Sequence, residues 1–388
     1  MFANFIPTPM KLELNDNQKM IKNMVREFAE KEIAPVAAEL DQKEEYPTKI
    51  LEKMAKLGLL GIIVPSEYGG AGLDTISYTT VIEEISRKCA STGVITSVHN
   101  SLVCWPIMHY GGEEQKKKYL PILAKGEKIG AFAGTEPNAG SDLGAMQTNA
   151  VLKGNKYIIN GDKTFITSGS EAGIIIVFAV TDKSAGPKGI SAFIVENTFK
   201  GYKVGSIYEK LGINASGTAE LIFENMEVPK ENLLGNEGEG FKIALSTLDG
   251  GRIGIGAQAV GIAQAALDES IEYSKQRQQF GRPIAKFQAI QWMIADMATH
   301  IEAARYLVYN AAYTKDKGER FSKEAAMAKL FASETAMDAV IKAVQIHGGY
   351  GYTKEYTVER LFRDAKITEI YEGTSEVQRL VISGALLK

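Results

Sequence analysis

Hydrophobic positions in the first third of the chain recur at helical spacing. In residues 15–34 the apolar side chains mostly fall three or four positions apart, which places them on one face of a helix. Asn15 or Asp16 is suited to cap this helix, and Pro35 is placed to end it. Similar patterns predict helices over residues 47–57, 75–90, 91–110 and 113–125. We therefore expect a helical N-terminal domain spanning residues 1–126.

The pattern changes near Gly126, where apolar and β-branched residues come in short runs. Two pairs with turn propensity, Gly154-Asn155 and Asn160-Gly161, lie among these runs. Asn next to Gly tolerates the positive φ of a tight hairpin. We therefore expect a middle antiparallel β-barrel or sandwich domain spanning residues 127–235. The predicted strands are residues 129–135, 156–160, 174–181, 191–196 and 219–228.

Helical spacing returns after Pro229 and the glycine-bearing segment 235–240, this time in long segments. Helices of this length pack as a bundle, so we expect a C-terminal four-helix bundle domain spanning residues 236–388. The order α, β, α gives an α+β fold, unlike the alternating strands and helices of a doubly wound nucleotide-binding domain. The predicted helices are residues 241–279, 287–315, 320–347 and 374–387.

Composition excludes several classes of partner. Of the 388 residues, 45% are hydrophobic and 23% are charged, which is typical of a folded globular protein. Lys and Arg total 44 against 47 Asp and Glu, so the net charge is −3 and no basic field attracts a phosphate backbone. The most apolar stretch, residues 174–180, is far shorter than the ~20 residues that cross a membrane. We therefore expect neither nucleic acid nor a membrane as a partner.

Cysteine and histidine are sparse. Cys89 and Cys104 have no CxxC spacing, and the four histidines have no HExxH-type pattern, so we expect no metal site. Residues 1–10 contain neither the apolar core of a signal peptide nor an Arg-rich transit segment. This predicts a cytoplasmic protein, although a matured organelle protein would share these features.

One nucleotide-binding pattern is present, GxGxxA at residues 254–259. That motif acts only directly after a strand, and the preceding residues 242–249 have a helical pattern. Small residues that allow close helix packing are therefore the favoured interpretation. No Gly-Lys dipeptide occurs, which excludes a P-loop.

Four segments carry candidate chemistry. Residues 132–142, FAGTEPNAGSD, run from a predicted strand into a loop whose backbone N–H groups could hold a phosphate or a ring edge. Residues 163–167 place an aromatic ring beside hydroxyls. Residues 249–252 contain an acidic side chain, Asp249, and a basic one, Arg252. Glu372 lies just before a helix that should start near Thr374, because Ser375 and Gln378 have capping-box spacing. Taken singly, each has an ordinary reading: a turn, a core aromatic, a surface ion pair and a solvated glutamate.

These segments share their order and spacing with one protein family. The blocks FAGTEPNAGSD, KTFITSG, LDGGR, RQQFG, QIHGGYGY and YEGTSEVQR together resemble the acyl-CoA dehydrogenase family over nearly the whole chain. Residues 91–102 and 247–252 are most similar to short-chain, butyryl-CoA-type members. The resemblance implies the same α, β, α layout, with FAD bound between the middle and C-terminal domains.

The resemblance assigns cofactor contacts. Phe165 stands where many relatives have Trp, so we expect weaker retention of the flavin. Arg277 suits a diphosphate, and the matching contacts near it reach the FAD of a neighbouring subunit, which implies a homotetramer. We interpret His347 as tolerated variation and not as a proton carrier. The matching cofactor residues are Phe132, Ala133, Thr135, Gly140, Ser141, Phe165, Ile166, Thr167, Arg277, Phe280, Gln288, Gln345, Ile346, His347, Gly348, Gly349, Thr374, Ser375 and Glu376.

Glu372 matches the catalytic base of the family. The resemblance implies that it removes the α-proton of an acyl-CoA while the β-hydrogen leaves as hydride to FAD, giving a trans-2-enoyl-CoA. Burial would raise the pKa of Glu372 and the adjacent helix N-terminus would lower it, and the sequence leaves the winner open. Some relatives carry the base at the position of Gly251, which has no side chain to act. The matching substrate contacts are Ser141, Asp249, Arg252 and Gly373.

The resemblance therefore implies a dehydrogenase of short acyl-CoA chains that passes electrons to an electron-transfer flavoprotein. Two alternatives stay open: the same chemistry on a cyclic or branched acyl-CoA, and a non-catalytic flavoprotein that serves as a scaffold. An acyl-CoA oxidase is less favoured, because such chains are usually much longer.

Overall fold

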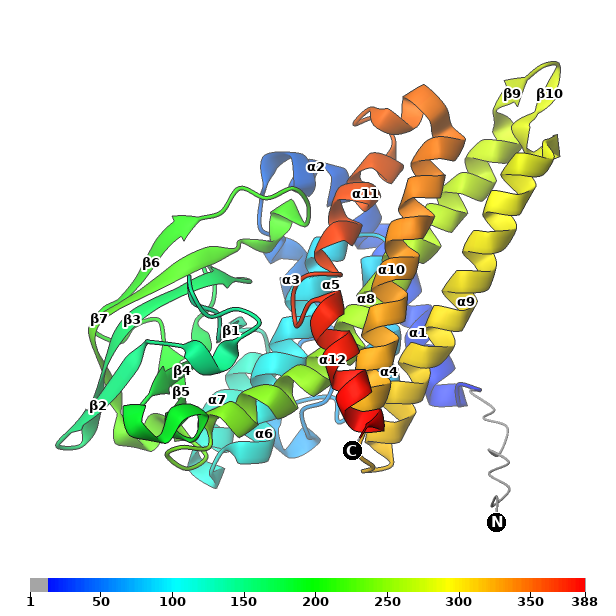
Figure 1. Ribbon diagram of the computed structural model, residues 1–388. Helices are drawn as coiled ribbons and strands as arrows, with labels where there is room; N and C mark the ends of the chain where they lie inside the picture. Colours follow the sequence, from blue (N-terminus) through cyan, green and yellow to red (C-terminus); the bar gives the residue numbers. More distant parts are fainter. Residues whose placement is uncertain (1–12, 388) are drawn as a thin grey trace, which may run out of the picture.

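The computed structural model describes residues 13–387, so the prediction made from residues 1–10 lies outside the described residues. The chain forms three successive parts, helical, β and helical, as expected. Figure 1 shows the strands of the middle part on one side and the long C-terminal helices on the other, with N-terminal helices between and behind them.

The first helix, α1 (Asp16–Phe28), is capped by Asn15 through reciprocal hydrogen bonds with Gln18, both 2.9 Å long. The prediction that Pro35 ends this helix is wrong. A π-helical turn, η1 (Ala29–Ile33), leads directly into α2 (Ala34–Lys43), and Pro35 lies in the first turn of α2. The predicted helix over 91–110 is likewise interrupted by a π-helical segment. The other N-terminal elements are α3 (Thr48–Lys56), α4 (Thr75–Ser86), α5 (Ala90–Ser97), η3 (Val98–Cys104), α6 (Trp105–Tyr110) and α7 (Glu113–Ala124).

The middle part is an eight-stranded sheet whose order is β6-β7-β3-β2-β4-β5-β8, with β1 paired to β4. The expectation of a purely antiparallel arrangement is wrong at two places, because β1 and β2 both pair with β4 in parallel. Strands β2, β6 and β8 were not predicted. The strands are β1 (Gly130–Ala133), β2 (Asn149–Lys153), β3 (Lys156–Ile166), β4 (Ile174–Val180), β5 (Ile190–Glu196), β6 (Tyr202–Ile207), β7 (Ala219–Pro229) and β8 (Leu233–Leu234).

The two predicted Asn-Gly-type turns differ in outcome. Gly154, with φ of 63°, lies in the tight hairpin that joins β2 to β3, as predicted. The prediction of a second hairpin at Asn160-Gly161 is wrong, because both residues lie inside β3 at a register irregularity against β7. Gly161 is needed there for close approach, since a Cβ would lie 2.5 Å from the hydroxyl oxygen of Thr148.

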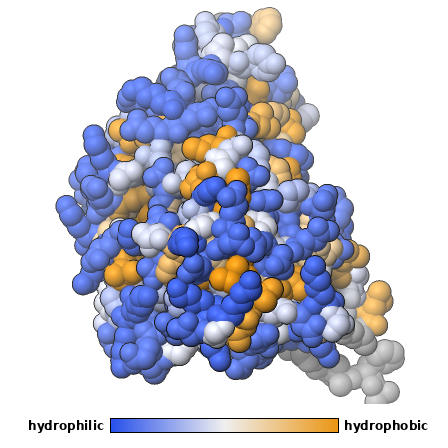
Figure 2. Space-filling model, turned by 90° about the vertical axis from the view of Figure 1, so that its left-hand side faces the viewer, coloured by the Kyte–Doolittle hydropathy of each residue, from blue (hydrophilic) through white to orange (hydrophobic). Residues whose placement is uncertain are grey.

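The sheet curls around one apolar core. Inward residues of β3 and β7 join those of β4 and β5 in a single buried cluster, with the rings of Tyr157 and Phe193 4.9 Å apart. The opposite face of β4 and β5 packs on α6, α7 and the start of α8. The side of the molecule seen in Figure 2 is largely hydrophilic, with apolar residues in small separate groups.

Three long helices, α8 (Gly240–Gln276), α9 (Gln288–Asp316) and α10 (Ser322–His347), pack against one another. Helices α11 (Thr357–Ile367), which was not predicted, and α12 (Ser375–Leu386) pack on α10. The GxGxxA segment lies inside α8, where Gly254 packs against Tyr78 and Ser97, so the helix-packing interpretation is confirmed. Between α8 and α9 a hairpin of β9 (Gln278–Gln279) and β10 (Arg282–Pro283) projects from the end of the helices (Figure 1). Within residues 13–387, no helix is both long and apolar enough to cross a membrane.

Candidate active site

Glu372 lies on a strained turn between α11 and α12. Its φ is 53°, in the left-handed region, which costs a residue other than glycine about 1–3 kcal/mol and persists only where neighbouring groups hold it. Helix α12 begins directly after the turn, because Thr374 accepts a hydrogen bond from the N–H of Val377 at 3.3 Å. The predicted helix start near Thr374 is confirmed, but the capping pair is not the one that capping-box spacing suggested.

Two buried side chains hold the backbone of this turn. Lys329 Nζ and Gln378 Nε2 each donate a hydrogen bond of 2.7 Å to the carbonyl oxygen of Gly373, and both side chains have no exposed surface. The N–H of Glu372, in contrast, makes no hydrogen bond within residues 13–387. That N–H is therefore free to donate to a ligand.

The carboxylate of Glu372 packs against α8. Both of its oxygens are shielded from solvent and have no hydrogen-bond partner in the described part of the chain. Gly251 provides the space, because a Cβ at that position would lie 2.1 Å from Oε2 of Glu372 and 2.8 Å from Cδ2 of Leu102. Any larger residue at position 251 would have to displace the carboxylate.

Burial decides the protonation of Glu372. It raises the pKa of Glu372 to about 8, against the opposing positive charges of Lys329 and Arg252. The sequence left open whether burial or the helix N-terminus governs the pKa of Glu372. Burial has the larger effect, and the effects that lower this pKa come from two side chains on α10 and α8. Burial also lowers the pKa of Lys329 to about 8, against the negative charge of Glu372.

Arg252 is buried on α8 and pairs with the partly exposed Asp249, so the ordinary interpretation as a surface ion pair is wrong. Their side chains lie 2.6 Å apart, and only 5% of the surface of Arg252 is exposed. Asp249 also accepts a hydrogen bond from Ser322 on α10, whereas Nε of Arg252 has no partner in residues 13–387. The guanidinium therefore retains a buried donor, and its positive charge acts on Glu372.

The loop after β1 is tied to β3. Thr164 donates a backbone hydrogen bond of 3.0 Å to the carbonyl oxygen of Thr135, and Glu136 and Ala139 exchange two backbone bonds across a tight turn. Of the expected cofactor residues here, Ala133 is buried in the sheet, whereas Gly140 and Ser141 are exposed. The exposed part of the loop is available to a ligand while its base is fixed.

A buried ion pair anchors this loop, and we did not predict it. Lys163 Nζ lies 2.8 Å from a carboxylate oxygen of Glu136, which also accepts the N–H groups of Gln147 and Thr148 at 2.6 and 3.0 Å. Burial lowers the pKa of Lys163 to about 8, against the carboxylate of Glu136. The sequence pattern could have indicated this, because side chains alternate along a strand and Lys163 is an even number of positions from the inward-facing Tyr157.

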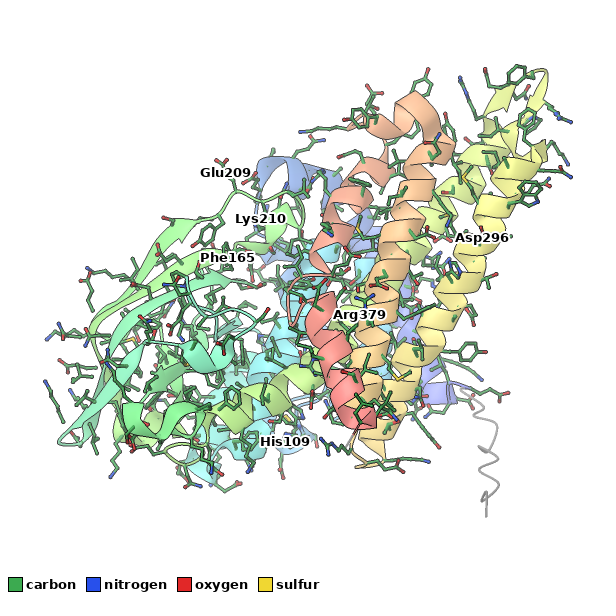
Figure 3. The ribbon with its side chains drawn as sticks, in the orientation of Figure 1. His109, Phe165, Glu209, Lys210, Asp296 and Arg379 are labelled. Carbon is green, nitrogen blue, oxygen red and sulfur yellow. The ribbon has the colours of Figure 1, made fainter. Side chains whose placement is uncertain are left out.

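Phe165 lies at the end of β3, on the side of the β domain that faces the C-terminal helices (Figure 3). Its φ is 57°, its ring is 63% exposed, and it lies 4.7 Å from the ring of Tyr208. The hydroxyl of Tyr208 is 2.6 Å from that of Thr164, which fixes the pair. The side chain of Ile166 lies in the sheet core, so this residue can offer a ligand only its backbone.

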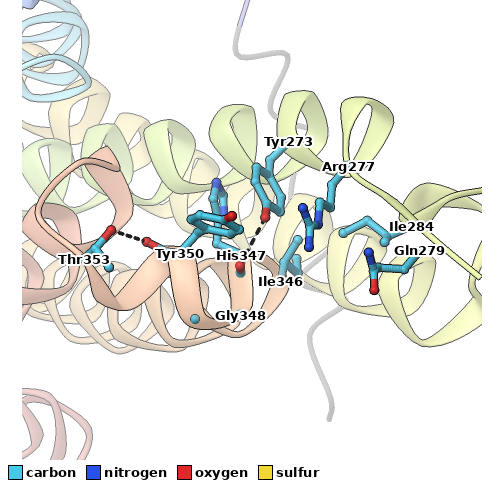
Figure 4. A pocket seen from close by; sticks show the side chains of 10 residues that line it. Tyr273, Arg277, Gln279, Ile284, Ile346, His347, Gly348, Tyr350 and Thr353 are labelled. Atoms are coloured by element: carbon cyan, nitrogen blue, oxygen red, sulfur yellow. Dashed lines mark hydrogen bonds between the residues drawn. The ribbon is translucent and has the colours of Figure 1, made fainter.

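A second cluster of expected cofactor residues lines a cavity of about 490 Å³ where the C-terminal ends of α8 and α10 meet, which we call the Arg277 pocket (Figure 4). The guanidinium of Arg277 lies 5.4 Å from the ring centre of Tyr350. Tyr273 donates a hydrogen bond to the carbonyl oxygen of His347 at 3.3 Å. The expected residues that line the pocket are Arg277, Ile346, His347, Gly348 and Gly349.

His347 is a structural part of this pocket. Its ring stacks on Tyr273 with centroids 4.1 Å apart, and its Nδ1 lies 2.8 Å from the carbonyl oxygen of Ala343. Burial lowers the pKa of His347, so the ring stays neutral near neutral pH. Gln288, Gln345 and Phe280, which is 93% exposed, do not line the pocket.

The two clusters are far apart in one chain. Gly251, beside Glu372, and Arg277 are separated by 26 positions along α8, which is about 39 Å at 1.5 Å per residue. That separation is longer than one dinucleotide. Within residues 13–387, no group of three or more His, Cys, Asp or Glu side chains could hold a metal ion.

The chain matches three domains of one family in the expected order. Residues 15–127 match the acyl-CoA dehydrogenase N-terminal domain, residues 131–226 the middle domain and residues 238–387 the C-terminal domain. The chain belongs to the acyl-CoA dehydrogenase family. Its members are oxidoreductases and flavoproteins, so the resemblance stated from the sequence is confirmed.

Relatives of this acyl-CoA dehydrogenase cover the full chain. A protein named short-chain-specific acyl-CoA dehydrogenase from Clostridium acetobutylicum is 57% identical over 98% of this chain and 100% of its own length. Butyryl-CoA dehydrogenase from Megasphaera elsdenii has a solved structure with a TM-score of 0.96 and 49% identity, covering 98% and 100% of the two chains. A chain in a structure described as the electron transferring flavoprotein of Acidaminococcus fermentans has a TM-score of 0.97 and 57% identity, with the same coverage.

Proposed function

We propose that this protein oxidises a short-chain acyl-CoA to the trans-2-enoyl-CoA with FAD as its cofactor and Glu372 as its base. The observation that carries the proposal is the carboxylate of Glu372, which is shielded, unpaired and directed at buried space beside α8. A pKa of about 8 makes this group a stronger base than an ordinary glutamate while leaving part of it ionised near neutral pH. Such a base matches the weakly acidic α-C–H of a thioester.

The backbone beside the base supplies the second requirement of the chemistry. Proton removal builds negative charge on the thioester carbonyl oxygen, and a fixed donor stabilises that charge. The free N–H of Glu372 is such a donor, and the turn that carries it is held by Lys329 and Gln378. Ser141, Asp249, Arg252 and Gly373 are the proposed substrate contacts, with Thr374, Ser375 and Glu376 next to the cofactor.

Two exposed segments of the β domain fit a flavin. Phe165 offers an exposed ring at the end of β3, and the exposed loop that contains Gly140 and Ser141 offers backbone donors beside it. When bound, FAD supplies the acceptor for the hydride that leaves the β-carbon. Phe132, Ala133, Thr135, Ile166 and Thr167 complete the proposed set on this side.

We propose that a second subunit completes the cofactor site. Because about 39 Å separate Gly251 from Arg277 along α8, one FAD beside Glu372 does not reach the Arg277 pocket of the same chain. The Arg277 pocket, with Phe280, Gln288 and Gln345 nearby, would instead receive the FAD tail of a neighbouring subunit. This agrees with the proposed homotetramer, which sedimentation of the purified protein tests. We also propose that an electron-transfer flavoprotein accepts the electrons and that the protein is cytoplasmic.

The variant Glu372→Gln tests the proposal directly. It removes the base and keeps the size of the side chain, so we expect bound FAD and ligand affinity to persist while anaerobic flavin bleaching by butyryl-CoA slows by at least ~100-fold. Stopped-flow absorbance measures the rate. A variant that bleaches at close to the wild-type rate would contradict the assignment of Glu372.

A panel of substrates separates the alternatives. Anaerobic titration with butyryl-, isobutyryl-, hexanoyl- and cyclohexanecarboxyl-CoA should bleach the flavin fastest with butyryl-CoA. Faster bleaching by isobutyryl- or cyclohexanecarboxyl-CoA would favour the branched or cyclic alternative. A purified protein that carries flavin but bleaches with none of the four would favour the non-catalytic scaffold, and rapid reoxidation by oxygen would favour an oxidase.

A further inference from the structure

Lys329 is an unusual residue for its position. It lies in the middle of α10 on the face formed by Ala325, Ala332 and Ala336, and its side chain is completely buried. Removing a charged ammonium from water is costly unless it gains partners. Its one hydrogen bond in the described chain is to the carbonyl oxygen of Gly373, at 2.7 Å. A buried cation has thus been placed under the turn that carries Glu372.

This position gives Lys329 two physical effects on one neighbour. Its hydrogen bond fixes the peptide group that follows Glu372, which keeps the turn in its left-handed conformation. Its charge acts on the carboxylate of Glu372 without forming an ion pair within 4 Å, because that carboxylate has no hydrogen-bond or salt-bridge partner in residues 13–387. The carboxylate can therefore be stabilised in its ionised form and still be open to a substrate proton.

We propose that Lys329 is the positioning residue of this site, because its ammonium group holds the Gly373 carbonyl under the base and balances the negative charge of Glu372. The inference rests on the proposed function and adds to it the residue that prepares the base. In this proposal Lys329 acts through the Gly373 carbonyl oxygen, to which its Nζ donates, and does not itself touch the substrate.

Other charged and titratable groups face the same space, and the test has to separate their effects from that of Lys329. Arg252 opposes the effect of burial on Glu372 from α8, and its own partner is Asp249. The remaining groups lie on α4 and on the segment around the turn: Tyr78, Glu369, Tyr371 and Glu376.

Gln378 provides a matched control. It donates to the same carbonyl oxygen over the same distance of 2.7 Å, and it is equally buried, but it has no charge. Lys329→Met removes one hydrogen bond to this oxygen and one charge. Gln378→Leu removes one hydrogen bond to this oxygen and a longer one, of 3.3 Å, to the carbonyl oxygen of Glu372, and leaves the charge in place. A purely structural role for Lys329 predicts that neither variant shifts the pH midpoint of the reaction.

The measurement is the pH dependence of anaerobic flavin bleaching by butyryl-CoA, whose rate in the wild type should rise with pH with a midpoint near pH 8. In Lys329→Met the midpoint should rise by up to about one pH unit, because the ammonium, whose own pKa is about 8, is charged over the lower part of the titration and there favours the ionised form of the carboxylate. Gln378→Leu should slow the reaction but leave the midpoint in place, and Lys329→Arg should restore it. Equal midpoints in Lys329→Met and Gln378→Leu would overturn the proposal.

A second readout does not depend on turnover. The infrared carboxyl band that is present in wild type and absent in Glu372→Gln reports the protonation of Glu372, and its titration should shift upward in Lys329→Met. If Lys329→Met does not accumulate, Lys329→Gln carries the same expectation. If no acyl-CoA bleaches the wild type, the proposed function fails, whereas the infrared titration still decides the inference: an unshifted band overturns it.

Discussion

The surroundings of Glu372 and the Arg277 pocket differ in how complete they are within one chain. Glu372 is enclosed by α8, its turn is held from α10 and α12, and the charges that act on it are buried with it. The Arg277 pocket is an open cavity whose backbone at Gly348 and Gly349 is exposed. The proposed base is therefore held in place within a single subunit, whereas the Arg277 pocket is open to a ligand that enters from outside the subunit.

This difference explains the kinds of residue in each region. A base must have a fixed position and a controlled pKa, so it is placed where no water competes and every neighbour is fixed. An anion-binding pocket has to admit a long ligand, so exposed backbone and a guanidinium that forks onto two oxygens suit it better. Changes in the first region should affect rates at constant cofactor content, and changes in the second should affect cofactor content at constant rate per flavin.

The largest effect is expected from Gly251→Ala, which disturbs only the enclosed surroundings of Glu372, here called the closed region. The added Cβ would lie 2.1 Å from Oε2 of Glu372, so the carboxylate has to move, and flavin bleaching should slow by about 10²–10⁴-fold. FAD content and subunit assembly should be unchanged, as measured by absorbance and sedimentation. Gly256→Ala is the control on the same helix, since its Cβ would lie 2.9 Å from the end of the Val308 side chain and at an ordinary contact distance of 3.7 Å from the backbone of Ala328 and Lys329. Similar rates for both variants would show that helix strain, not the base, is responsible.

The next effect is expected from Lys163→Met, which tests whether the loop beside Phe165 belongs to the closed region. The change leaves Glu136 as an unpaired buried charge, which should cost roughly 3–5 kcal/mol in free energy of unfolding. Thermal denaturation with FAD in excess measures the loss, and flavin fluorescence measures release of the cofactor. The double variant Lys163→Met/Glu136→Gln should recover part of the stability. A double variant as unstable as the single one would show that Lys163 acts through packing alone.

Much of the fold could be predicted because its elements have strong local patterns. The long helices α8, α9 and α10 were predicted to within a few residues, and the capping of α1 by Asn15 follows from local chemistry. The errors arose where tertiary contacts override that chemistry. Pro35 did not end a helix, because a π-helical turn carries the chain into α2, and Asn160-Gly161 did not form a hairpin, because Thr148 packs against the glycine.

The candidate site divides in the same way. Glu372 was found through its sequence block, and its place next to a helix start followed from the capping pattern. Lys329 and Lys163 were missed, although both fall on the buried face of their element by simple periodicity. Whether burial or the helix N-terminus governs Glu372 depends on side chains that come from α8 and α10. Such contacts between distant segments leave no local signal.

The smallest effect is expected from Arg277→Leu, which disturbs only the open Arg277 pocket. A hydrogen bond to a charged group contributes about 1.5–3 kcal/mol, so losing the guanidinium should weaken FAD binding by roughly 10–100-fold. Bleaching by butyryl-CoA, expressed per bound flavin, should stay close to that of the wild type, because Gly251, which packs against Glu372, lies about 39 Å from Arg277 along α8. Arg282→Leu is the matched control, because it removes the same charge from the adjacent hairpin, where Arg282 lies 4.5 Å from the ring centre of Phe287. Equal loss of FAD in both variants would mean that the hairpin attracts the cofactor through its overall charge. A lower rate per flavin in Arg277→Leu alone would mean that the two regions are coupled, and the distinction between a prepared base and an open cofactor pocket would then no longer hold.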